Sequence, residues 1–145
     1  MIKMASRDLY NNIKVVRAIS PQLYENGVNP DGQTIDTKGF ESVTLVFTAG
    51  TITDAQTLTL QHSVDDSTYN DVTAADVIAD PDNTAASILT AFKATGTTDN
   101  VIKLLGYKGG RRYLKVDGDG AGATGANYGV VAILGHGQYP PTDRS

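Results

Sequence analysis

One stretch of the chain matches a known ligand-binding pattern letter for letter. Residues 120–125, Gly-Ala-Gly-Ala-Thr-Gly, fit the G-x-G-x-x-G fingerprint of dinucleotide-binding loops. That fingerprint holds a pyrophosphate only when a strand precedes it and a helix N-terminus follows it. The segment that follows here, residues 128–135, has the apolar pattern of a strand. We therefore interpret residues 120–125 as a loop.

Paired carboxylates raise the possibility of a metal site. Asp117 and Asp119 have the spacing with which a calcium loop begins, but such a loop needs a bidentate Glu at its twelfth position, which is Tyr128 here. Asp65 and Asp66 are more typical of a turn. The chain has no cysteine, which removes thiolate metal sites and cysteine nucleophiles. We expect neither a metal nor a cofactor.

The chain has two histidines, around which any acid–base site would have to be built. His62 falls on a predicted strand, where a packed or hydrogen-bonded ring is commoner than a catalytic one. His136 follows a predicted strand between two glycines. Neither is accompanied by a Gly-x-Ser-x-Gly elbow, a phosphate loop or a pair of glutamates. The sequence thus predicts a protein that is not an enzyme.

Five of the 12 basic residues lie within a 13-residue window of a chain with a net charge of -4. Tyr107 and Tyr113 are interleaved with them, as on nucleic-acid surfaces where cations meet phosphates and rings stack on bases. A protein-docking surface or a solvated strand face fits equally, since period-2 alternation divides such residues between two faces. We favour a protein partner and expect no nucleic acid. The five are Lys103, Lys108, Arg111, Arg112 and Lys115.

Composition favours strands and turns over helices. The chain has 14 Asp but only 2 Glu, with 17 Thr and 15 Gly, and Glu is the helix former among these types. A chain of 145 residues can bury one core. No apolar run approaches the roughly 20 residues of a membrane span, so we expect no membrane partner and synthesis in a cytoplasm.

Alternating apolar residues predict about eight short strands. Val43, Leu45 and Phe47 alternate with hydroxylated residues, whereas the last strand is a nearly continuous apolar run of the kind found inside a packed sheet. The first strand should end at Ser20-Pro21. The expected strands are residues 13–19, 34–36, 41–48, 57–62, 69–72, 100–105, 111–117 and 128–135.

Turn residues predict how these strands pair. Residues 41–48 and 57–62 should form a meander through Gly50, and residues 100–105 and 111–117 a hairpin. The strongest hairpin signal is the Asp- and Ser-rich turn after His62.

These patterns predict an all-β protein, an antiparallel β-sandwich of jelly-roll type with about eight strands and little helix. We expect an N-terminal arm over residues 1–12, the domain over residues 13–136 and an extended tail over residues 137–145. Residues 73–99 fit helical spacing in part, and we favour extended structure with a short helical turn there. Residues 117–127 should form a mobile loop.

Four segments together resemble small virion proteins of tailed phages. They are G-x-x-I-D-T-x-G-F-E-S-V-T (residues 32–44), L-x-L-x-x-S-x-D-x-S-x-Y (58–69), G-Y-x-G-G-x-R-Y-L-x-V (106–116) and the final L-G-H-G (134–137). This group includes capsid cement, or decoration, proteins with jelly-roll folds. The shared motifs are structural rather than chemical.

The resemblance implies a structural protein that binds the outer face of an icosahedral phage head and stabilises capsomer junctions. Its implied partners are the major capsid protein and further copies of itself, as a dimer or trimer, and its implied location is the virion. The alternatives are a carbohydrate- or receptor-binding module of a phage fibre, or a minor head–tail connector. The residues expected to contact the capsid or the oligomer are Leu9, Tyr10, Arg111, Arg112, Tyr113 and Tyr139.

Overall fold

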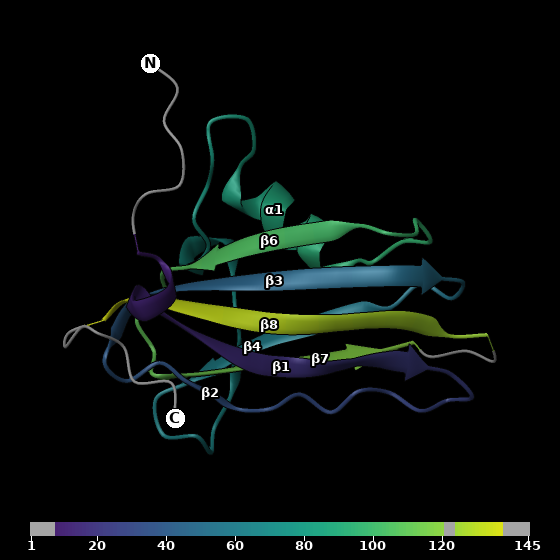
Figure 1. Ribbon diagram of the computed structural model, residues 1–145, viewed down its shortest axis with the longest axis horizontal. Helices are drawn as coiled ribbons and strands as arrows, with labels where there is room; N and C mark the ends of the chain where they lie inside the picture. The colour runs from purple at the N-terminus through teal and green to yellow at the C-terminus, as the bar shows by residue number, and fades with distance from the viewer. Residues whose placement is uncertain (1–7, 121–123, 138–145) are drawn as a thin grey trace.

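Two antiparallel four-stranded sheets pack face to face in the computed structural model, which describes residues 8–120 and 124–137 (Figure 1). The strand order is β1-β8-β3-β6 in one sheet and β2-β7-β4-β5 in the other. The strands are β1 (Ile13–Tyr24), β2 (Ile35–Asp36), β3 (Phe40–Ile52), β4 (Thr57–Ser63), β5 (Asn70–Asp71), β6 (Ile102–Tyr107), β7 (Tyr113–Asp119) and β8 (Ala126–Gly137).

The pairing of the strands follows from one long hairpin that is wrapped on itself. β1 pairs with β8, β2 with β7, β3 with β6 and β4 with β5, so each strand of the first half meets its counterpart in the second. Two further pairings, β3 with β8 and β4 with β7, complete the sheets. This is the arrangement of an eight-stranded jelly roll. The predicted all-β sandwich is confirmed.

The core lies between the sheets and is built by period-2 alternation. In β3, Val43, Leu45 and Phe47 are buried while the residues between them are partly exposed, as the sequence predicted. The alternation is possible because successive side chains in a strand point to opposite faces. The largest fully buried side chains include Ile19, Ile35, Leu45, Phe47, Leu58, Leu60, Phe92, Leu105, Leu114, Tyr128 and Leu134.

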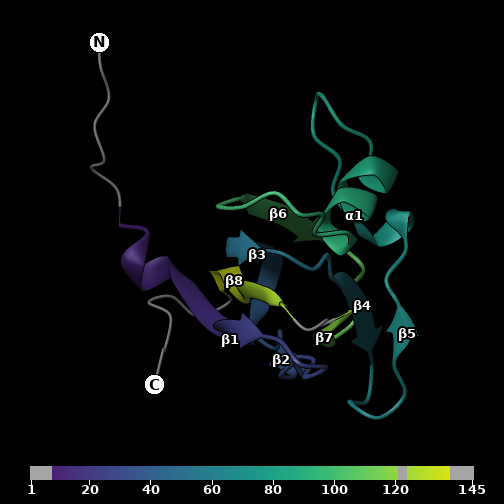
Figure 2. The ribbon, with the colours of Figure 1, turned by 90° about the vertical axis from the view of Figure 1, so that its right-hand side faces the viewer.

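Residues 85–93 form an α-helix, so the extended structure favoured there is wrong, whereas the 3₁₀ turn η2 (Ala74–Asp76) is a short helical turn of the kind predicted within residues 73–99. The helix α1 (Ala85–Lys93) begins at Thr84, whose side chain accepts a hydrogen bond from the Ser87 amide. Phe92 is its buried residue and packs edge-on against Phe47, with ring centroids 6.5 Å apart. Figure 2 shows α1 closing the gap between β6 and β4 at one side of the sandwich. Burial of Phe92 against Phe47 therefore favours the helical over the extended conformation of residues 85–93.

Two predicted hairpins are wrong for a common reason. β3 and β4 are neighbours in sequence but belong to different sheets, and so do β6 and β7. β3 continues through Gly50 to Ile52 before the chain crosses to the opposite layer. By contrast, the turn after His62 does join paired strands, since His62 pairs with Asn70 across β4 and β5.

The first strand does not end at Ser20-Pro21 but continues to Tyr24. Its register with β8 shifts twice between Arg17 and Gln22, which accommodates the proline as an irregularity in an edge strand. Gly129 of β8 lies opposite this shift, where an added Cβ atom would come within 2.8 Å of Pro21. The absence of a side chain at Gly129 of β8 therefore makes room for Pro21 within β1.

The β7–β8 connection is held at one end by a carboxylate. Asp54 accepts hydrogen bonds from the Thr124 amide (3.1 Å), the Thr124 hydroxyl (2.8 Å) and the Gly125 amide (2.7 Å). These hydrogen bonds lower the pKa of Asp54, and the bond from the Gly125 amide has the largest effect. The loop predicted over residues 117–127 is shorter than expected, because β7 reaches Asp119 and β8 begins at Ala126.

Truncation of Phe92 tests whether α1 is held by this single anchor. Phe92→Ala should lower the free energy of unfolding by about 3–5 kcal/mol, since a fully buried aromatic side chain is lost and a cavity remains. The measurement is urea unfolding followed by far-UV circular dichroism. Leu89→Ala, on the same helix but only partly buried, is the matched control and should cost clearly less; an equal loss would contradict the anchor.

Candidate protein-binding surface

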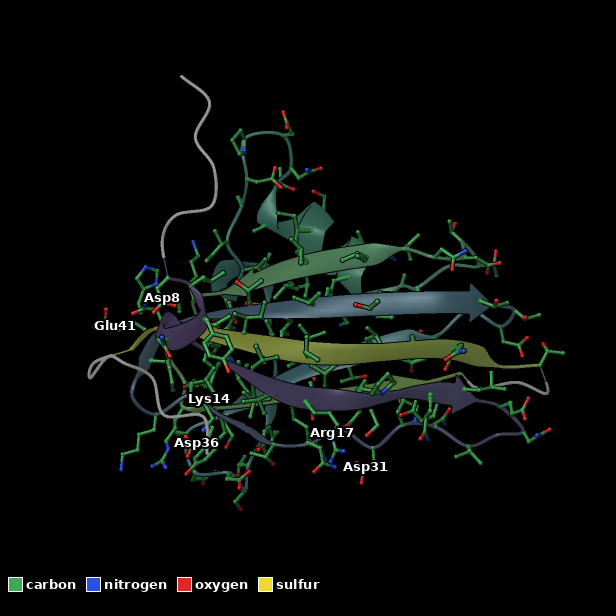
Figure 3. All side chains as sticks on the ribbon, in the orientation of Figure 1. Asp8, Lys14, Arg17, Asp31, Asp36 and Glu41 are labelled. Carbon is green, nitrogen blue, oxygen red and sulfur yellow. The ribbon has the colours of Figure 1, made fainter. Side chains whose placement is uncertain are left out.

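One end of the sandwich collects segments that are far apart in sequence. The 3₁₀ turn η1 (Tyr10–Asn12) leads into β1 there, and β8 ends beside it, since Ile13 pairs with Gly135. The β2–β3 and β6–β7 connections lie at the same end, where the Thr37 amide donates to the Arg112 carbonyl at 2.9 Å. Figure 3 labels Asp8, Glu41 and Asp36 in this region. We call it the η1 end.

Most of the predicted contact residues lie at the η1 end. Leu9 and Tyr10 stand at the start of the described chain with 66% and 71% of their surface exposed. Arg111 and Arg112 belong to the β6–β7 connection, and Tyr113 begins β7. The sixth residue, Tyr139, lies outside the described residues.

Two hollows flank this end on either side of Ser42. The first, of about 420 Å³, runs from η1 over the end of β8. The second, of about 410 Å³, lies between the β2–β3 and β6–β7 connections. The first is lined by Leu9, Asn12, Ile13, Ser42, Thr44, Ile133, Gly135, His136 and Gly137; the second by Thr37, Phe40, Glu41, Ser42, Val43, Ile78, Tyr107, Lys108, Gly110 and Arg111.

An ion pair fixes the position of Arg112. Its guanidinium donates two hydrogen bonds of 2.8 Å to the two carboxylate oxygens of Asp36 and lies 4.8 Å from the ring centre of Tyr113. The bond to Arg112 is the main reason why the pKa of Asp36 falls to about 2. This geometry joins β2 to the start of β7, so Arg112 holds the fold at the η1 end as well as presenting charge there.

The five clustered basic residues do not form one patch. Lys103 points toward α1 and donates to the carbonyls of Ala91 (2.8 Å) and Ala94 (2.7 Å) near the helix C-terminus. Lys115 lies 3.5 Å from a carboxylate oxygen of Asp31. The remaining pair, Lys108 and Arg111, lines the second hollow.

The two histidines occupy different environments. His62 is buried, and its Nδ1 lies 2.7 Å from the Tyr107 hydroxyl oxygen. That oxygen accepts a hydrogen bond from the Arg111 amide at 3.3 Å. Desolvation by burial lowers the pKa of His62. His136 is exposed, with Nδ1 2.9 Å from the Ser42 hydroxyl. Within the described ranges, no three His, Asp or Glu side chains are grouped so that they could hold a metal ion.

A second surface, which the sequence analysis did not single out, is the outer side of the β1-β8-β3-β6 sheet. Strand register brings the outward residues into rows: Arg17, Val131, Val46 and Leu104 form one row, and Val15, Ile133, Thr44 and Gly106 the next. Five of these eight residues are large and apolar. The signal for it was the unbroken apolar run of β8, since a strand with one solvated face normally alternates. We call this surface the outer face. Its apolar members are Val15, Leu23, Val46, Ile78, Ile102, Leu104, Val131 and Ile133.

The structure therefore defines a jelly-roll domain with two candidate surfaces, the η1 end and the outer face, which meet at the first hollow, because Thr44 and Ile133 belong to both. No family model, curated protein or solved structure matches the chain. Among the residues that the structure describes, no helix is long and apolar enough to cross a membrane.

Removal of the Asp36 carboxylate should weaken the fold in a pH-dependent way. The folded pKa of about 2 lies below the ordinary 3.8, so the stabilisation is complete above about pH 4 and is lost as the pH falls toward 2. Because both partners are nearly half exposed, Asp36→Asn should cost at most about 1 kcal/mol at neutral pH.

The measurement is urea unfolding of wild type and variant at several pH values. Their difference should shrink between pH 4 and pH 2 and in high salt. The control is Asp82→Asn, an exposed acid without an ion pair in the described part of the chain. A difference that is independent of pH would exclude the ion pair as its cause.

Proposed function

We propose that this protein is a structural virion component that binds the outer surface of an icosahedral phage head and stabilises the junctions between capsomers. The major capsid protein is the proposed partner, with a homo-oligomer as the binding unit and no catalytic role. The observation that carries the proposal is the η1 end, where exposed apolar residues and cations from separate parts of the chain lie together. The resemblance of four segments to phage virion proteins supports the same role.

The η1 end has the composition of a protein contact. Leu9 and Tyr10 are large exposed side chains, and Leu9 lines the first hollow. Lys108 and Arg111 add positive charge at the second hollow. Aromatic and Arg side chains are enriched where protein interfaces concentrate their binding energy. A cement protein gains further strength from repetition, because an oligomer that has bound once presents its other contacts at high effective concentration.

Substitution of the apolar pair tests this end as the anchor. Leu9→Ser with Tyr10→Ser should raise the apparent dissociation constant for purified heads at least about tenfold, because two buried side chains are lost from the contact. The measurement is the number of bound copies per particle, from gel densitometry of washed heads. Val28→Ser, which removes another apolar side chain of similar exposure (60%), is the matched control. Unchanged binding by the double variant would rule out the anchor.

Charge at the second hollow is tested separately. Arg111→Gln should weaken head binding by roughly twofold to tenfold and reduce its dependence on salt, because a screened attraction is removed. Arg112 is left intact because it holds Asp36. Lys93→Gln, at the end of α1, removes the same charge elsewhere and should bind like wild type. If head binding changes neither with Arg111→Gln nor with salt concentration, electrostatic attraction does not contribute to it.

A further inference from the structure

We propose that the outer face of the β1-β8-β3-β6 sheet is the interface between two copies of this chain, which pack face to face as a two-fold symmetric dimer. This deepens the proposed function and rests on it for the orientation of the dimer. The interface itself rests on four observations: the apolar pattern of the face, its lack of acids, its protected edges and its area.

The outer face carries more exposed apolar side chains than a solvated sheet normally does, although β3 presents Ser42, Thr44 and Thr48 on it beside Val46. Nine large apolar side chains are exposed among the described residues, and five of them belong to this face. At its centre Val131 and Ile133 of β8 point outward between the inward Val130, Ala132 and Leu134, so β8 is apolar on both sides. Strands of this composition are typical of sheets that are covered on both faces. The five exposed side chains are Val15, Leu23, Ile78, Ile102 and Leu104.

Acidic residues avoid this sheet. β1, β3, β6 and β8 together contain one of the 16 acids of the chain, Glu41, at the start of β3. Arg17 is the one charged residue in the apolar rows of the outer face. Two copies of an acidic protein repel each other wherever their carboxylates come close. Because the outer face has no acidic residue in its rows, a second copy can approach it without repulsion between carboxylates.

Both edges of this sheet are partly covered, which disfavours its association edge to edge. On the β6 edge, the Ile78 amide donates to the Gly106 carbonyl at 2.9 Å, and Val77 bridges Tyr107. On the β1 edge, the Gln33 amide donates to the Ala18 carbonyl at 2.8 Å, and Pro21 interrupts the strand. Such devices prevent edge-to-edge pairing. Figure 2 shows that, of the described elements, η1 alone approaches the outer face, at one end.

The area is sufficient for a stable dimer. Four strands about 4.8 Å apart, three of them 12 or 13 residues long at about 3.3 Å per residue, present about 650 Å². Two copies would bury about 1,300 Å², within the range of specific interfaces. Sheets pack with their strands nearly aligned. A two-fold axis along the strands and one across them both keep the strands aligned. The proposed function selects the axis along the strands, which puts both η1 ends on one side so that one dimer can bind a lattice through two contacts.

Sedimentation velocity of the purified full chain at tens of micromolar tests the dimer. The molar mass obtained for the wild type should be twice the chain mass of 15.3 kDa. Leu104→Glu with Ile102→Glu should sediment as a monomer, with the dissociation constant raised at least about 100-fold, because each copy then buries two carboxylates. These side chains are 60% and 69% exposed, so the monomer itself should remain folded by circular dichroism.

The matched control is Val28→Glu with Val64→Glu, at positions that are also 60% and 69% exposed but lie off the outer face; it should remain a dimer. A wild-type monomer, a trimer, or a dimer that survives the outer-face substitutions would overturn the interface. None of these results would decide whether the protein occupies heads, so failure of the dimer and failure of the proposed function can be told apart.

A distance measurement tests the interface without altering it. The chain has no cysteine, so Glu41→Cys introduces a single site for a spin label at the η1 end. Dipolar spectroscopy should give a distance below about 30 Å, because the two sheets lie about 10 Å apart and both η1 ends are on one side. A distance of about 40 Å or more, or no coupling at all, would overturn the proposed arrangement.

Discussion

The contact between Phe47 on β3 and Tyr128 on β8, which are neighbouring strands of one sheet, lies at the centre of the aromatic cluster that fills the core of the sandwich. Their ring centres lie 5.4 Å apart, and the cluster continues to Tyr24 on β1 and to Phe92 on α1. The Tyr128 hydroxyl is buried without a hydrogen-bond partner among the described residues, and desolvation raises its pKa. An unmade hydrogen bond costs about 1–3 kcal/mol, whereas burying the ring contributes roughly 4–6 kcal/mol, so packing prevails.

Local patterns predicted strands well and their partners poorly. The alternation of Val43, Leu45 and Phe47 could be read from sequence because burial on one face imposes it. The crossing from β3 to β4 could not, since a connection between layers uses the same turn residues as a hairpin within one sheet. The helix at Ala85–Lys93 was missed because its spacing is ambiguous until Phe92 is known to meet Phe47.

The predictability of the two surfaces differs in the same way. Leu9 and Tyr10 were singled out because they follow no periodic pattern, and tertiary structure then brings the Arg111 loop to their end of the molecule. The outer face was overlooked because its rows consist of single residues from four strands, and only strand register aligns Val46 with Val131 and Leu104. The sequence shows Arg112 as one of five clustered basic residues, whereas its ion pair with Asp36 is a long-range contact that no local pattern reveals.

The pairing of Ile13 with Gly135 has a practical consequence for attaching cargo. Both ends of the described chain lie at the η1 end, so a peptide placed next to residue 8 or residue 137 would crowd the surface that we propose to meet the head. Asn26 and Gly27 form a tight turn at the opposite end, with φ values of 56° and 76° and the Val28 amide bonded to the Glu25 carbonyl. Foreign sequence inserted within that turn would therefore lie away from the surface that we propose to meet the head.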